Sequence, residues 1–161
     1  MRRVLATIWA VFASTAVVAQ APLGSGELEE TFAMMREFMA TERETMLESE
    51  LSLTRTERRA FWPLYEKYRA EMATAQDRLG QLLTEFAENY ADPTDEQANR
   101  FIDEYFAVEQ RMLEIRREYL PAFREILPAQ KVARFVQIEN KVDGVARLPL
   151  IMDTPLIGDS E

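Results

Sequence analysis

Two uninterrupted patterns of apolar residues in the middle of the chain constrain its fold most strongly. In each pattern the spacing alternates between four and three residues, which keeps the apolar side chains on one side of an α-helix. The members are Phe61, Tyr65, Tyr68, Met72, Ala75, Leu79, Leu82 and Phe86, followed by Phe101, Tyr105, Val108, Met112, Ile115 and Tyr119. Because such seams pack one helix against another, the sequence predicts an all-α protein.

The segment between the two patterns predicts a tight connection. Asp92-Pro93 interrupts the first long helix, and Thr94 with Gln97 forms a capping box that begins the second. Since only a few residues separate the two helices, they must fold back as an antiparallel hairpin. At 1.5 Å per residue this hairpin would be roughly 45–50 Å long.

Two further helices are expected, one on each side of the hairpin. Upstream, an apolar stripe that Glu42 interrupts predicts a helix from about residue 27 to residue 50; downstream, a second stripe predicts a helix that ends at Asp143-Gly144. The stripes are Leu28, Phe32, Met35, Met39 and Met46, and then Val132, Phe135, Ile138 and Val142. Pro63 and Pro121 are expected to bend or end the long helices. The predicted architecture is four helices with a long, bent hairpin in a domain over 27–144, and an extended tail over 145–161 that either docks or frays.

The N-terminus has the features of a secretory signal peptide over 1–19. A basic start at Arg2-Arg3 precedes a mostly apolar stretch, and Val17-Val18-Ala19 supplies the small residues of a cleavage site. The alternative is a membrane anchor, but about 15 apolar residues are short for a span of roughly 20. We therefore expect cleavage after Ala19, a linker over 20–26, a periplasmic location and no membrane span after cleavage.

Charge and residue usage argue against several functions. Loss of Arg2 and Arg3 would leave 17 basic and 28 acidic residues, a net charge of −11, which disfavours nucleic acids and anionic membranes as partners. The chain has no cysteine and no histidine. It therefore lacks the usual zinc ligands and the base of a Ser-His-Asp triad. The sequence predicts no enzymatic activity, no cofactor and no metal site.

Four residues are candidates for contact with a client or partner. Met34 lies off the apolar stripe beside Phe38, and this pair could form an exposed apolar patch. Met46 belongs to a methionine-rich first helix, and flexible methionine suits surfaces that adapt to several partners. Trp62 lies next to the seam, where it is either an anchor in the core or dimer interface, or a client contact.

A short motif occurs twice, 73 positions apart, at the starts of two predicted helices. The first copy begins Leu53-Thr54, and its Thr54 and Glu57 can form a capping box. The second copy runs from Ile126 to Gln130 and places Pro128 at the first helical position, where a missing N–H costs nothing. Glu57 and Gln130 hold the same place in the two copies. Helix capping explains the motif without any further role.

With these motifs, the chain resembles the Spy/CpxP family of periplasmic proteins, which carry two Leu-Thr-x-x-Gln repeats. The resemblance spans roughly Glu27 to Val142 and implies a cradle-shaped homodimer with ATP-independent chaperone activity, or restraint of an envelope-stress sensor. Glu57 stands where the family has Gln, and the second copy lacks the threonine. A related branch binds metals through His and Cys, which are absent here.

The favoured function is therefore chaperone-like binding of unfolded or stress-damaged clients. The alternatives are a regulatory partner of an envelope-stress sensor kinase, which would bind one defined ectodomain, and a purely structural helical dimer. A homodimer is also expected on physical grounds. A thin hairpin buries few apolar residues alone, and the faces around Phe61-Trp62 and 101–106 require a second surface.

Overall fold

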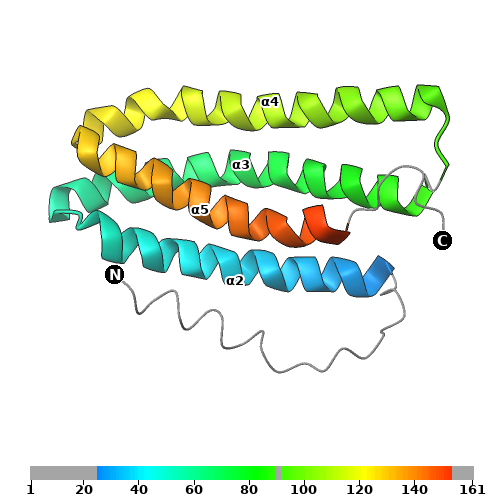
Figure 1. Ribbon diagram of the computed structural model, residues 1–161. Coiled ribbons are helices and arrows are strands. Elements are labelled where there is room, and N and C mark those ends of the chain that lie inside the picture. The colour runs from blue at the N-terminus through cyan, green and yellow to red at the C-terminus, as the bar shows by residue number, and fades with distance from the viewer. Residues whose placement is uncertain (1–24, 90–91, 154–161) are drawn as a thin grey trace. The chain divides into compact units, whose positions relative to one another are not determined.

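The computed structural model describes residues 25–89 and 92–153, and within these ranges the chain forms four α-helices and no strand (Figure 1). The helices are α2 (Ser25–Leu51), α3 (Arg55–Asn89), α4 (Asp95–Ile126) and α5 (Ala129–Asp153). Side-chain environments are described for 38–86 and 92–148. The predicted all-α fold with four helices is confirmed.

The chain divides into two units, residues 1–36 and 37–161, and every contact reported below lies within the second unit. The predicted signal peptide over 1–19 and most of the predicted linker lie outside the described residues. Helix α2 begins at Ser25, so the last two residues of the expected linker are helical instead.

Helices α3 and α4 form the predicted antiparallel hairpin. Aromatic contacts follow it from one end to the other, with ring centroids 4.2 Å apart for Phe86 and Phe101 and 5.7 Å apart for Phe61 and Phe123. The predicted capping box at the start of α4 is present. The Gln97 amide donates to the Thr94 hydroxyl at 3.3 Å, and the Thr94 amide donates to the Gln97 side chain at 2.9 Å.

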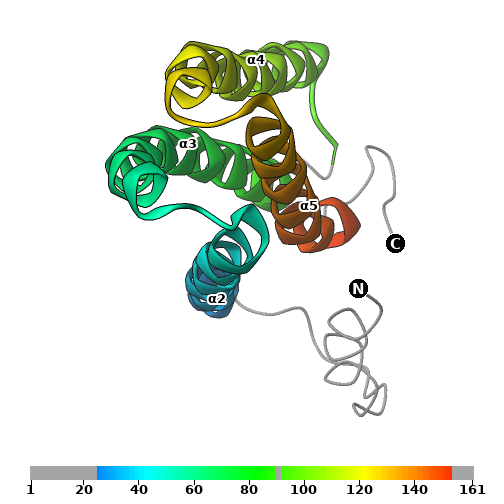
Figure 2. The same cartoon turned by 90° about the vertical axis from the view of Figure 1, so that its left-hand side faces the viewer.

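Helix α5 adds to the core of the hairpin. All eight seam residues of α3 are buried, and so are Val108, Met112 and Ile115 of α4. From α5, the Phe135 ring lies 5.7 Å from Phe61 and 4.5 Å from Phe123. Figure 2 shows α5 alongside both α3 and α4. The aromatic cluster therefore joins three helices.

The two helical prolines end neither long helix, whereas one predicted helix end is wrong. Pro63 and Pro121 lie inside α3 and α4, and α4 continues to Ile126. The predicted end of the last helix at Asp143-Gly144 is wrong, because α5 continues to Asp153. Residues 145–153 of the expected extended tail are therefore helical, and 154–161 lie outside the described residues. The Asp143 carboxylate binds arginines on other helices, so this dipeptide does not act as a helix stop.

Candidate functional site

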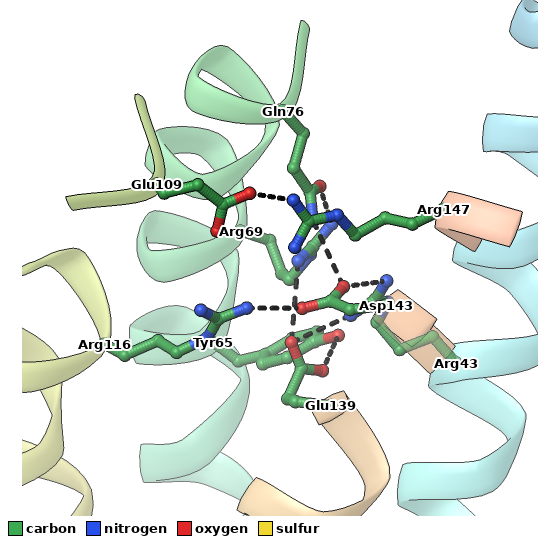
Figure 3. A network of polar contacts seen from close by, with 9 residues as sticks. All are labelled: Arg43, Tyr65, Arg69, Gln76, Glu109, Arg116, Glu139, Asp143 and Arg147. Carbon is green, nitrogen blue, oxygen red and sulfur yellow. Dashed lines mark hydrogen bonds and ion pairs between the residues drawn. The ribbon is translucent and has the colours of Figure 1, made fainter. Parts of the chain in front are cut away.

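A buried cluster of charged side chains connects α2, α3, α4 and α5 (Figure 3). Arg43 from α2 is 3% exposed, and Glu139 and Asp143 from α5 are 2% and 4% exposed. The Arg43 guanidinium donates to Glu139 Oε2 at 2.9 Å and to Asp143 Oδ1 at 2.8 Å. One arginine thus binds two carboxylates that lie one helical turn apart on α5.

The hairpin supplies the remaining partners of the two carboxylates. From α3, the Tyr65 hydroxyl donates to Glu139 Oε1 at 3.2 Å, and Gln76 Nε2 donates to Asp143 Oδ1 at 3.1 Å. Arg116 of α4 donates to Asp143 Oδ2 at 2.9 Å. All four carboxylate oxygens therefore accept hydrogen bonds, which is the condition for burying such charges without a large cost.

The surroundings shift the pKa values of these groups in opposing ways. Burial raises the pKa of Asp143, but attraction and hydrogen bonds from Arg43 and Arg116 outweigh burial and hold that pKa below its usual value. Burial, together with the Glu139 charge, raises the pKa of Tyr65, so its hydroxyl stays protonated and donates. The cluster thus holds fixed charges in fixed hydrogen bonds and joins α2 and α5 to the hairpin.

This cluster was not predicted from the sequence, because the apolar stripe of α2 places Met46, and not Arg43, on the buried side of the helix. Met39, Arg43, Leu47 and Leu51 are buried at a constant spacing of four, whereas the predicted member Met46 is half-buried. One signal was available. Arg43 lies midway between Met39 and Leu47, a position where a charged residue must bring its own partners.

The two copies of the repeated motif meet in the structure. The Thr54 amide donates to Glu57 Oε2 at 2.7 Å and the Glu57 amide to the Thr54 hydroxyl at 3.3 Å, which confirms the capping box. Lys131, which follows Gln130 in the second copy, donates to the same Glu57 oxygen at 2.7 Å and to the Ser52 carbonyl at 2.8 Å. An ion pair therefore links the starts of α3 and α5.

Other motif residues have supporting roles. Leu53 is buried, whereas Gln130 is exposed. Pro128 lies immediately before α5 and its carbonyl accepts from the Val132 amide at 3.1 Å, so it occupies the cap rather than the predicted first helical position. Ser52 turns the chain between α2 and α3 with a positive φ of 48°.

Three of the four predicted client-contact residues lie among the side chains that the structure describes. Phe38 is 57% exposed, while Met46 and Trp62 are half-buried. The Trp62 indole N–H donates to Glu48 at 3.0 Å, and Glu48 lies about 15 Å along α2 from Phe38. The side chain of Met34 lies outside the described residues.

Exposed apolar side chains occur elsewhere, and most were not singled out from the sequence. Besides Phe38, the large exposed apolar residues are Ile102, Phe106, Leu113, Val136, Val145 and Leu148. The described helices include none whose length and apolar character would suit a membrane span. Among the same residues, no group of three or more acidic side chains could hold a metal ion.

The ionisation of Glu57 is expected to make stability depend on pH. Hydrogen bonds from Lys131 and Thr54 lower the pKa of Glu57 from 4.5 to about 2. Because the folded state favours the charged form, this stabilisation is fully present above pH 4.5 and is lost as the pH falls towards 2. Urea unfolding should therefore show Glu57→Gln to be less stable than the original protein at pH 7, by a margin that shrinks below pH 4.5.

Glu125→Gln is the matched control, because Glu125 is exposed and forms no ion pair with another described residue. Its difference in free energy of unfolding from the original protein at pH 7 should be small, because no ion pair is lost. If the stability difference between Glu57→Gln and the original protein stays constant from pH 7 to 2.5, the ionisation of Glu57 does not contribute to folding as proposed.

Comparisons with known proteins do not place this chain in a family. No family model matches it, and no curated protein or solved structure matches it significantly. A proposal about function therefore depends on the side chains described above and on the resemblance of the short motifs.

Proposed function

We propose that this protein is a periplasmic, ATP-independent chaperone-like protein that binds unfolded or stress-damaged clients. One observation supports the proposal most directly. Phe38, Val145 and Leu148 expose 57%, 52% and 54% of their surface on helices whose other exposed residues are mainly polar. Unfolded chains display apolar segments, and we propose that these exposed side chains are the groups such segments contact.

The three residues lie at a similar level along two helices. Arg43 contacts Glu139 and Asp143, and α2 and α5 run in opposite directions past this contact (Figure 1). Phe38 lies five residues before Arg43, and Val145 and Leu148 lie two and five residues after Asp143. At 1.5 Å per residue, all three are within about 8 Å of that level along the helix axes.

We propose that Phe38, Val145 and Leu148 act together as one client surface, which we name the α2–α5 patch. The buried cluster holds α2 against α5 at this level. A client would then bind residues on two fixed helices and would lose entropy mainly on its own side. Such binding requires no nucleotide, because release follows from the modest affinity of a small apolar surface.

Light scattering during dilution of a chemically denatured client tests this function. Stoichiometric protein is expected to suppress aggregation. The triple variant Phe38→Ser/Val145→Ser/Leu148→Ser should require roughly tenfold more protein for the same suppression, since three lost apolar contacts remove on the order of 1–2 kcal/mol of binding. Val136→Ser, an exposed apolar residue of α5 outside the patch, is the matched control and should act like the original protein.

Aggregation that continues unchanged in the presence of stoichiometric protein would reject chaperone-like binding. Equal suppression by the triple variant and the original protein would reject the α2–α5 patch as the client surface. If capture from envelope extracts recovers one dominant ectodomain instead of many proteins, the regulatory alternative replaces the proposal.

A further inference from the structure

A groove lies between α3 and α4, on the side of the hairpin away from α5. Its volume is about 400 Å³, and its apolar floor consists of Ala75 from α3 and of Ala107, Val108 and Ile115 from α4. The groove arises from residue size, because alanine stands at position 75 where the neighbouring seam positions hold methionine and leucine. Small side chains on both helices leave a space that the hairpin itself does not fill.

Helix α5 packs on the opposite side of the hairpin (Figure 2). On α4, Glu109 binds Arg147 of α5, and Arg116 binds Asp143 of α5. Ala107 precedes Glu109 by two residues, which corresponds to a rotation of about 200° around the helix. Ala107 therefore projects from nearly the opposite side of α4, and it is exposed.

Polar contacts between the two helices close the groove at both ends. At one end, Glu71 of α3 accepts hydrogen bonds from Arg111 at 2.9 Å and from the Tyr119 hydroxyl at 2.6 Å. At the other end, Arg78 of α3 forms an ion pair with Glu104 of α4. Glu71 and Arg78 are seven residues apart, so about 10 Å of the groove lies between them. This length suits one large apolar side chain rather than a long apolar stretch.

The groove suits a protein partner better than a small molecule. Small-molecule sites enclose roughly 70–90% of their ligand, whereas Thr74, Ala107 and Arg111 are exposed and leave this groove open along its side. A helix of a partner can approach closely, because short side chains at the point of contact reduce the distance between two helix axes. One apolar side chain of that helix would then enter the groove as an anchor.

The charge around the groove selects the chemistry of the partner. Five acidic side chains surround two arginines, and these acidic side chains are 38–59% exposed. The acidic residues are Glu71, Glu85, Glu104, Glu114 and Glu118, and the arginines are Arg78 and Arg111. Since both arginines are already paired with these carboxylates, the excess negative charge attracts a partner with basic residues and repels an acidic one.

We infer that the α3–α4 groove binds a basic amphipathic helix of another protein. One leucine or aromatic residue of that helix enters the groove, and a lysine or arginine lies one turn before and one turn after it. One of these bases pairs with Glu71, Glu114 or Glu118, and the other pairs with Glu85 or Glu104. The groove is separate from the α2–α5 patch, so this inference does not rest on the proposed function.

Fluorescence anisotropy with a labelled synthetic peptide tests the inference. The probe is a helix of about four turns with leucine on one side and lysine on the other, and it is expected to bind the original protein at a single site. A peptide with serine in place of leucine lacks the anchor, and a peptide with glutamate in place of lysine has the wrong charge. Each should bind roughly tenfold more weakly or worse.

Ala107→Arg locates the binding site. The arginine would fill the groove and repel a basic helix, so peptide binding is expected to weaken roughly tenfold or more. Because Ala107 is exposed and arginine is a good helix former, the variant should fold normally. Ala133→Arg is the matched control, since Ala133 is also exposed but lies on α5. It changes the net charge by the same amount and should bind the peptide as the original protein does.

Unchanged peptide binding by Ala107→Arg, or equal binding of the leucine and serine peptides, overturns the inference. A groove occupied by a second copy would instead appear in sedimentation as a dimer that Ala107→Arg disrupts, and this result would also overturn it. Neither measurement uses an aggregating client, so a failure here is distinct from a failure of chaperone-like binding.

Discussion

Phe61→Ala is expected to lower the free energy of unfolding by about 3–5 kcal/mol. The Phe61 side chain is completely buried, and its ring lies within 6 Å of Tyr65 on α3, Phe123 on α4 and Phe135 on α5. Removing the ring would leave a cavity where three helices meet, and the surrounding aromatic rings can fill such a space only in part. Urea unfolding monitored by circular dichroism measures the loss.

Phe38→Ala is the matched control for this substitution. It removes the same atoms from a side chain that is 57% exposed, so we expect a change of about 0.5 kcal/mol or less. Similar losses for both variants would show that the aromatic cluster does not dominate stability.

Arg43→Met is expected to cost about 3 kcal/mol at neutral pH, because it leaves two buried carboxylates without their shared partner. Arg69 and Arg116 still lie 3.5 Å and 2.9 Å from Glu139 and Asp143, respectively. We therefore expect a loss of unfolding free energy at the lower end of the range found when a buried ion pair is broken. Urea unfolding measures this loss.

The difference in free energy of unfolding between Arg43→Met and the original protein should also depend on pH. Since the pKa of Asp143 lies below its ordinary value of 3.8 in the folded state, the stabilisation from its charge is present above pH 3.8. It is lost as the pH falls through the folded pKa. Arg58→Met breaks an ion pair whose side chains are 47% and 36% exposed, and it should cost less than about 1 kcal/mol. Equal costs for the two variants would contradict the role of the buried cluster.

Local patterns were sufficient to predict four helices and the capping boxes at the starts of α3 and α4. The four-three spacing from Phe61 to Phe86 predicted a long helix with one buried side, and all of its positions are buried. Thr54 and Thr94 were recognised as caps, because a capping box needs only residues three positions apart. These features depend on neighbours in the chain, so a single sequence contains the necessary information.

The parts that could not be predicted depend on contacts between distant residues. Arg43 is buried because it binds Glu139 and Asp143, and these two residues lie 96 and 100 positions away in the chain. The same contacts explain why helix α5 does not end at Asp143-Gly144. Sequence periodicity on α2 could not choose between Met46 and Leu47, since the choice depends on which side of α2 faces α5.

The surface residues were predicted only in part, for a similar reason. Phe38 was expected to be exposed and is exposed, although its role in binding remains a prediction. Phe61 and Phe106 both belong to faces that were expected to need a second copy. Phe61 is covered by the chain's own helices, whereas Phe106 is exposed. Exposure of an apolar residue depends on which helices cover it, and this follows only from the assembled fold.

The ion pair between Glu57 and Lys131 has a consequence for the order of folding. It joins positions 74 residues apart and closes a loop that contains the whole α3–α4 hairpin. The chain entropy lost on closing so long a loop is recovered only after the hairpin has brought its ends together. The capping box of α3 can form early, whereas the contact between the two motif copies marks the completion of folding and acts mainly to slow unfolding.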